Sequence, residues 1–201
     1  MYVAVGASDT VGVGADDPEQ DGWVPQLYRK LPKGSRLVRL GVSGSTAEEA
    51  LRDQVPRAER EKAELVTVWL AVNDFNALIS SDDYEKTLTE ILRRLRVGGA
   101  AVFLGNVPDL TLVPIYRSLP KTIVAARVKQ YNQAIERASL ETGAVLVDLF
   151  EPSKQLARNG DSLISDDGFH PSEEGYDLLA KTFWMAIENT GLRKEALRSK
   201  V

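Results

Sequence analysis

Three side chains of this sequence are of the types that make up a nucleophile, a base and an orienting carboxylate. Ser8 lies in Gly6-Ala7-Ser8 directly after an apolar run, where its hydroxyl can act as a nucleophile once a base removes the proton. His170 is the one histidine of the chain, so imidazole acid–base chemistry near neutral pH must use it. Asp167 precedes it by three residues, and a carboxylate beside an imidazole fixes the tautomer and stabilises the imidazolium.

Two further segments contain groups that can stabilise a developing negative charge. Gly44 lies in Gly41-Val42-Ser43-Gly44, where glycine lets a backbone N–H approach a ligand closely. Asn73 follows the most apolar run of the chain and can donate its side-chain amide into a cleft. Taken one at a time, these residues are as well explained by turns and helix caps, and His170 by a solvated position before a helix. Only their joint arrangement favours a catalytic site.

Composition excludes several other chemistries. The 201 residues include no cysteine and one histidine, which rules out disulfides, thiol nucleophiles, iron–sulfur clusters and zinc sites built on cysteine or on several histidines. We therefore expect no metal and no organic cofactor. The net charge is −4 and the basic residues are dispersed, so we expect no nucleic-acid partner.

Hydropathy sets expectations about membranes and location. The longest strongly apolar run, Leu65 to Val72, is far shorter than the roughly 20 residues that span a bilayer, so we expect no stable membrane insertion. The first residues lack the basic and apolar regions of a signal peptide, which favours a cytoplasmic protein.

The elements that must position these residues alternate along the chain between short β-rich runs and longer stretches of helical period. The predicted strands are Tyr2–Gly6, Arg36–Gly41, Leu65–Leu70, Ala100–Gly105 and Ala144–Asp148. The predicted helices are Gly22–Leu31, Thr46–Lys62, Asp82–Val97, Pro120–Thr142 and Ser172–Asn189.

This alternation predicts an α/β fold, a three-layer α/β/α sandwich with a central, mostly parallel five-stranded sheet. The length fits a single domain over residues 1–190, followed by a basic tail over 191–201. Ligands of such sheets bind outside the carboxyl ends of the strands. Ser8, Gly44 and Asn73 all follow predicted strands, so we expect them to meet at that edge.

Together the four loops resemble the SGNH hydrolase superfamily, the GDSL-type esterases and lipases. The first block, Gly-Asp-Ser, is similar to Gly6-Ala7-Ser8, and Gly44 matches the second-block glycine. The third, Gly-x-Asn-Asp, resembles Ala71-Val72-Asn73-Asp74, and the last, Asp-x-x-His, is matched fully by Asp167-Gly168-Phe169-His170. Block order and spacing fit from residue 2 to about 185.

Two residues depart from the family pattern. Ala7 stands where the family usually has aspartate, which puts the rigidity of the nucleophile loop in doubt, and Asp9 is a candidate to cap the same turn instead. Ala71 stands where it usually has glycine, a change that ordinary backbone angles would tolerate. Neither departure removes a reacting group.

The resemblance implies a flavodoxin-like SGNH hydrolase fold and a serine hydrolase that cleaves carboxylic ester or thioester bonds of small or lipid-like acyl substrates. Ser8 would form the acyl-enzyme, His170 would act as base and Asp167 would orient it, with Asp166 as the competing carboxylate. Ser8, Gly44 and Asn73 would form the oxyanion hole.

Substrate-binding residues are expected in the apolar loop after the fourth strand and in the turn after Asn73. The candidates are Phe75, Leu112, Ile115 and Tyr116. Three alternatives stay open: an acyltransferase that uses the same site, a non-catalytic binding module on the same fold and, more distantly, a flavin- or nucleotide-binding protein. The sequence leaves the oligomeric state undetermined.

Overall fold

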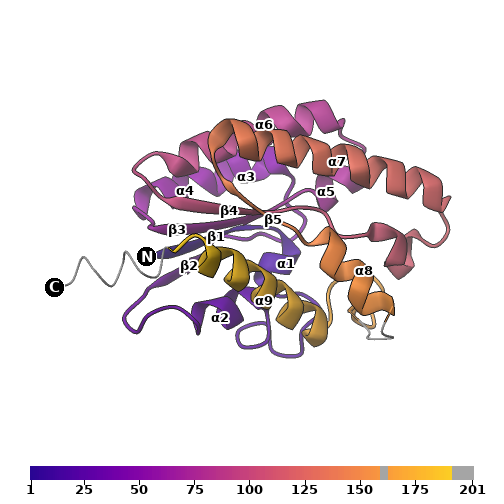
Figure 1. The fold of residues 1–201 in the computed structure, drawn as a ribbon, viewed down its shortest axis with the longest axis horizontal. Coiled ribbons are helices and arrows are strands. Elements are labelled where there is room, and N and C mark those ends of the chain that lie inside the picture. Colours follow the sequence, from indigo (N-terminus) through magenta and orange to yellow (C-terminus); the bar gives the residue numbers. More distant parts are fainter. Residues whose placement is uncertain (159–162, 192–201) are drawn as a thin grey trace.

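The protein is built on one parallel sheet of five strands in the order β2-β1-β3-β4-β5 (Figure 1). A computed structural model describes residues 1–158 and 163–191, except for the side chains of 155–158. The strands are β1 (Tyr2–Gly6), β2 (Leu37–Arg39), β3 (Leu65–Trp69), β4 (Ala101–Gly105) and β5 (Val145–Val147). All five predicted strands are present, somewhat shorter at their ends, and the predicted parallel sheet is confirmed.

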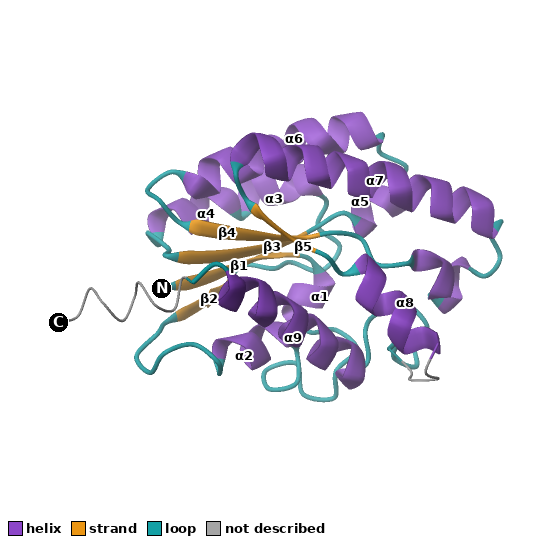
Figure 2. Cartoon of the chain, in the orientation of Figure 1, coloured by secondary structure: helices purple, strands orange, loops and turns teal. Residues whose placement is uncertain are grey.

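Helices cover both faces of the sheet, as predicted for a three-layer sandwich. Figure 2 shows α3, α4, α6 and α7 on one face and α2 and α9 on the other. The helices are α1 (Ser8–Val11), α2 (Trp23–Tyr28), α3 (Ala47–Asp53), α4 (Val55–Arg60), α5 (Val72–Asn76), α6 (Ser81–Arg96), α7 (Lys121–Thr142), α8 (Phe150–Arg158) and α9 (Glu173–Asn189). No helix within the described ranges has the length and apolar character needed to cross a bilayer.

Alternating side chains of the strands build two separate cores. Along β1, Val3 and Val5 point into the core beneath α6 and α7, whereas Tyr2 and Ala4 point into the core beneath α2 and α9. The two-residue repeat of a strand produces this division, and β3 and β4 follow it too. Both faces are buried, which explains why the strands are apolar throughout.

The predicted helix Thr46–Lys62 is wrong in one respect, because it is broken into α3 and α4 at Gln54. Pro56 has no backbone N–H, and its ring disfavours continuing the helix that precedes it. The break leaves Gln54 almost fully buried, with 1% of its surface exposed.

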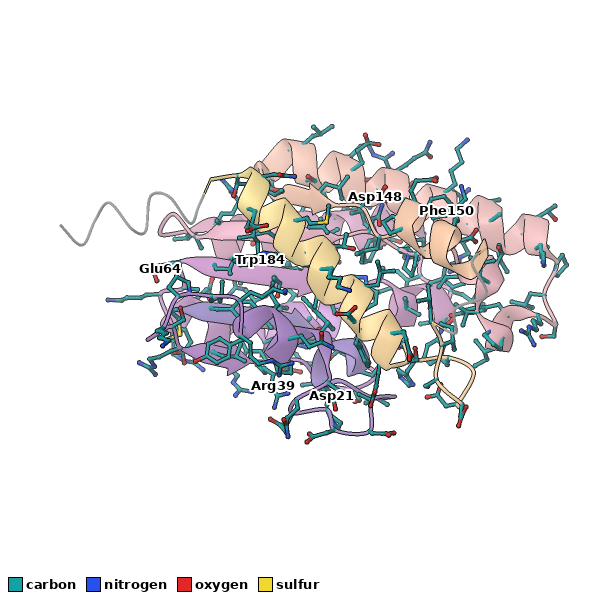
Figure 3. The ribbon with its side chains drawn as sticks, turned by 60° about the horizontal axis from the view of Figure 1, so that its bottom comes forward. Asp21, Arg39, Glu64, Asp148, Phe150 and Trp184 are labelled. Atoms are coloured by element: carbon teal, nitrogen blue, oxygen red, sulfur yellow. The ribbon has the colours of Figure 1, made fainter. Side chains whose placement is uncertain are left out.

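Three short α-helices and two 3-10 helices, Leu110–Leu112 and Pro114–Tyr116, lie where only loops were expected. α1 and α5 begin directly after β1 and β3, so Ser8 and Asn73 lie in first turns of helices. α8 begins after Asp148, whose Oδ1 accepts a hydrogen bond from the Phe150 N–H at 2.9 Å (Figure 3). The predicted tail 191–201 lies outside the described residues apart from Gly191.

Ala71 occupies a backbone conformation that favours glycine. Its φ is +139°, so the condition under which alanine would be tolerated there, ordinary backbone angles, is not met. The residue is buried and lies two positions before Asn73. Strain of this kind typically costs about 1–3 kcal/mol, which the surrounding structure must offset.

We therefore predict that Ala71→Gly raises the free energy of unfolding by about 1 kcal/mol, because relief of strain exceeds the entropy that glycine loses on folding. Denaturant titration measures the change. Ala77→Gly, at the other end of α5 with φ of −74°, is the matched control and should destabilise the protein. Equal destabilisation by both substitutions would show that Ala71 is unstrained.

Candidate active site

The strand order places the ends of β1 and β3 at the point where the chain connections diverge. In a sheet of order 2-1-3-4-5 this switch point lies between strands 1 and 3, and the loops that leave it in opposite directions form a cleft. Ser8 follows β1, and Asn73 follows β3. The sheet therefore brings together two residues that are 65 positions apart in sequence.

Ser8 is the first residue of α1 and is 7% exposed. Its Oγ forms no hydrogen bond with any described residue, yet it is not among the polar atoms that are sealed from solvent. The hydroxyl is thus free to meet a ligand. Thr10, two residues later, has its hydroxyl packed against Gly6, where an added Cβ would lie 2.0 Å from Thr10 Oγ1.

Asp167 and His170 lie in a closed hairpin between α8 and α9. An antiparallel bridge between Ile164 and Pro171 closes the hairpin, and the Ser165 N–H donates to the His170 carbonyl at 2.8 Å. The Gly168 N–H donates to the Ser165 carbonyl at 2.9 Å, in a turn where Gly168 has φ of +74°. That conformation favours glycine, so residue type and loop shape agree here.

Within the hairpin the Asp167 carboxylate holds the His170 ring. His170 Nδ1 lies 2.6 Å from Asp167 Oδ2, while Oδ1 accepts from the backbone N–H groups of Phe169 and His170 and from the Ser165 hydroxyl. Burial alone would raise the pKa of Asp167, but these hydrogen bonds, above all that from the His170 ring, hold the pKa well below its usual range.

The ionised Asp167 carboxylate can only accept, so Nδ1 carries the proton and Nε2 is left as a base. Asp166, the competing carboxylate, forms no hydrogen bond to the ring in the described structure.

Ser8 and His170 form no direct hydrogen bond in the described structure, but the residue next to Ser8 lies within electrostatic reach of His170. The Asp9 carboxylate, next to Ser8, interacts electrostatically with His170 and with Asp167. Burial raises the pKa of Asp9 to about 6, although the charge of His170 opposes this rise. Catalytic hydrogen bonds commonly tighten only when substrate binds, so a longer separation is compatible with proton transfer.

Gly14 supports this arrangement from the loop after α1. A Cβ at Gly14 would lie 2.9 Å from the His170 Cβ and 2.6 Å from the Pro171 carbonyl oxygen. The Tyr176 hydroxyl donates to the Val13 carbonyl at 2.5 Å, which ties the same loop to α9.

Three N–H donors in the segments that follow β1, β2 and β3 have hydrogens without an acceptor in the described structure. Among the described residues, the backbone N–H groups of Ser8 and Gly44 have no acceptor. The Asn73 side-chain amide donates one hydrogen to the Ser45 carbonyl at 2.9 Å, which leaves its second hydrogen free. Gly44 has φ of +82°, in the left-handed region of backbone conformation that favours glycine. These are the three donors expected from the sequence.

Gln54, which sequence reasoning missed, joins the loops that carry these donors. Its Oε1 accepts from the Gly6 N–H at 3.0 Å, and its Nε2 donates to the Gly6 carbonyl at 2.9 Å and to Ser45 Oγ at 3.2 Å. Ser45 in turn holds Asn73. One buried amide thus connects the nucleophile strand to both oxyanion-side loops. No local signal marks Gln54, because its partners are 48 and nine residues away.

Asp74 fixes the turn of Asn73 from the other side. Both of its carboxylate oxygens accept from the Ala47 N–H at the start of α3, at 3.0 and 3.1 Å. The side chain is buried, and burial raises the pKa of Asp74 to about 6 against the lowering effect of these hydrogen bonds. The Asn-Asp pair of the third block was the available signal for this residue.

The predicted substrate-binding residues are not all exposed to a ligand. Phe75 and Tyr116 are buried and pack edge to face at 5.7 Å, and Tyr116 also contacts Phe169, the neighbour of His170. They form an aromatic row between the Asn73 turn and the catalytic hairpin. Leu112 and Ile115 are exposed.

A cavity of about 460 Å³ adjoins the hairpin on the side of α8 and α9. Leu112 is the only one of the four predicted residues that lines it, and neither Ser8 nor His170 does. A Cβ built on Gly44 would meet no atom within 4 Å, so there is open space beside Gly44, which does not line that cavity.

A sheet of this order with a serine after β1 and an Asp-x-x-His hairpin before the last helix is the SGNH hydrolase fold. The model of the GDSL-like lipase/acylhydrolase family matches residues 4–178, so the chain belongs to that family. The protein YpmR of Bacillus subtilis (strain 168) is 25% identical, over 97% of this chain and 84% of its own length.

Two further comparisons agree with this assignment. The GDSL-like esterase Rv1075c of Mycobacterium tuberculosis is 26% identical over 61% of this chain, which corresponds to 39% of that protein. The crystal structure of TesA superposes with a TM-score of 0.75 at 22% identity, covering 94% of this chain and 98% of TesA.

We predict that Gln54→Leu lowers the free energy of unfolding by about 2–4 kcal/mol, because buried Gly6 and Ser45 groups lose their partners. Ester turnover should fall by about tenfold or more as the N–H donors lose their alignment, with kcat affected more than KM. Gln130→Leu on the exposed face of α7 is the control and should change neither. Full turnover in Gln54→Leu would mean that the donors are held by other contacts.

The Asp74 carboxyl gives a prediction for pH. Its folded pKa of about 6 lies above the ordinary value of 3.8, so the folded state retains the proton longer than the unfolded state does. Stability contributed at this site is therefore lost as pH rises from about 4 to 6, by up to about 3 kcal/mol, and changes no further above pH 6.

The difference in unfolding free energy between wild type and Asp74→Asn isolates this contribution, because the other titrating groups cancel. As pH rises from about 4 to 6, the unfolding free energy of the wild type should fall relative to that of Asp74→Asn. A difference that stays constant from pH 4 to 7 would show that the carboxyl titrates normally.

Proposed function

We propose that the protein is a serine esterase that hydrolyses carboxylic esters through an acyl-enzyme at Ser8. The observation that supports this most directly is the 2.6 Å contact between Asp167 Oδ2 and His170 Nδ1, which leaves Nε2 free to act as a base. The unpaired N–H groups of Ser8 and Gly44 and the free amide hydrogen of Asn73 supply the oxyanion hole.

In the first half of the reaction, His170 Nε2 takes the hydroxyl proton while Ser8 Oγ forms a bond to the ester carbonyl carbon. The carbonyl oxygen becomes an oxyanion, which the three donors stabilise. When the tetrahedral intermediate collapses, the bond from carbon to the alcohol oxygen breaks, and His170 returns the proton to the leaving alkoxide. The imidazolium present between these steps is stabilised by the ionised Asp167.

In the second half, water takes the place of the alcohol. His170 removes one proton from the water as its oxygen attacks the acyl carbon, and the same donors hold the second oxyanion. Collapse then breaks the bond to Ser8 Oγ, which recovers its proton from His170, and the carboxylic acid leaves. No step requires a group beyond these side chains, the substrate and water.

Membership of a lipase/acylhydrolase family and the similarity to a protein named as an esterase favour oxygen esters as substrates. We propose small-molecule carboxylic esters as the substrate class. The corresponding thioesters should be assayed alongside them to compare the two kinds of acyl bond.

The test is hydrolysis of a series of p-nitrophenyl esters of increasing acyl length by the wild type, Ser8→Ala, His170→Asn and Asp167→Asn. Turnover should be lost with Ser8→Ala and His170→Asn and should fall by orders of magnitude with Asp167→Asn. Asp166→Asn is the matched control, since this neighbouring carboxylate is exposed and forms no contact with the ring.

Hydrolysis that persists in Ser8→Ala would place the chemistry elsewhere. Loss of activity in Asp166→Asn with retention in Asp167→Asn would reverse the assignment of the orienting carboxylate.

A further inference from the structure

Exposed large apolar side chains gather at the end of the molecule that carries the site. Of the nine in the described residues, five form a group that we call the apolar rim, with 40–78% of their surfaces exposed. The apolar rim comprises Leu78, Leu112, Ile115, Leu119 and Ile123. Four of the five come from a stretch of only 12 residues. A concentration of exposed large apolar side chains in one short segment marks an interaction surface.

The apolar rim is continuous with the catalytic hairpin and the Asn73 turn. The Ile115 N–H donates to the Gly168 carbonyl at 3.1 Å, between Asp167 and His170. On the other side, the Tyr116 hydroxyl donates to Asn76 Oδ1 at 2.8 Å, and Leu78 follows two residues later. A partner that contacts the apolar rim would therefore lie beside the hairpin and the Asn73 turn.

The first turns of α7 project beyond the helical layer. Arg127 and Tyr131 both donate to the Ile79 carbonyl, which precedes α6, so the residues of α7 before Arg127 extend past the start of that helix (Figure 1). Ile123 and Lys121 lie on this projecting end.

Leu78 is held outward at a conformational cost. Its φ is +59°, which is rare for a bulky side chain, and it is the most exposed member of the rim. Burial of a leucine in contact with a partner would offset this cost.

The charged side chains of the segment that carries most of the apolar rim are all cationic. Residues 110–135 contain four cations and no carboxylate, in a chain whose net charge is −4. Arg117, Lys121 and Lys129 form no ion pair within the described structure. The later part of α7 differs, because Arg137 and Glu141 pair with residues of α6.

The nearest carboxylate before this stretch, Asp109, accepts from Thr111 through both the backbone N–H and the hydroxyl, so it faces its own turn. Arg117 lines the same cavity as Asp109 and the exposed Asp166, without an ion pair to either, whereas Lys121 and Lys129 do not line it.

We infer that the apolar rim and its cations dock the protein on an anionic phospholipid surface. Leucine and isoleucine side chains would enter the boundary between headgroups and acyl chains, and Arg117 and Lys121 would contact phosphate groups, which is how surface-bound amphipathic segments bind membranes. This is adsorption without a spanning segment. It does not rest on the proposed esterase function, because none of these side chains takes part in the chemistry.

The test is sedimentation of the Ser8→Ala protein with phosphatidylcholine vesicles that contain increasing shares of phosphatidylglycerol. Using Ser8→Ala separates docking from hydrolysis. Binding should rise with the anionic share and weaken with added salt, because the attraction is screened. The double variant Arg117→Glu, Lys121→Glu should bind about tenfold more weakly or worse.

A second pair of variants tests the apolar part. Leu119→Glu and Ile123→Glu should each weaken binding, whereas Leu140→Glu, a matched change on the far end of α7 at 77% exposure, should leave it unchanged. All five side chains that these variants change are exposed, so folding should be preserved and can be checked by circular dichroism.

Three outcomes would overturn the inference. They are absence of binding to anionic vesicles, equal binding by rim and control variants, and a self-associated wild type that Leu119→Glu or Ile123→Glu converts to a monomer. The last result, seen by sedimentation velocity, would assign the rim to a contact between copies of the chain.

Discussion

The side-chain amide of Gln54 is the interaction on which the geometry of the site depends. It donates to and accepts from the same residue, Gly6, at the end of β1, and it reaches Ser45 with its second hydrogen. Ser45 then holds Asn73. Because the amide is sealed from water, breaking any of these bonds leaves a buried polar group without a partner. These bonds consequently fix the end of β1, the Ser45 loop and the Asn73 turn relative to one another.

The catalytic hairpin is organised in a different way. Asp167 and His170 are three residues apart, and their contact is fixed within one short loop by backbone hydrogen bonds to the same carboxylate. That unit must then be positioned against Ser8, and Gly14 allows the close approach because it has no Cβ. Substitution of the family's aspartate by Ala7 leaves α1 without a side-chain cap, and Asp9 is instead directed toward the charges of the hairpin.

The apolar rim lies beside the hairpin that carries Asp167 and His170, because the Ile115 N–H donates to the Gly168 carbonyl. Its members flank the aromatic row of Phe75, Tyr116 and Phe169, which packs between the Asn73 turn and the hairpin. Contacts at the rim would therefore bear on elements that position the donors and the base.

The sequence by itself determined the five strands, the layers and the candidates for the reacting groups, because strand period, apolar runs and the spacing of Asp167 and His170 are local properties. The break at Gln54, the helices α1, α5 and α8, and the strain at Ala71 depended on tertiary structure. So did the burial of Phe75 and Tyr116, expected as pocket walls. These features arise from contacts between residues distant in the chain: Gln54 reaches Gly6 across 48 positions, and only packing decides which apolar side chain meets a core and which meets solvent.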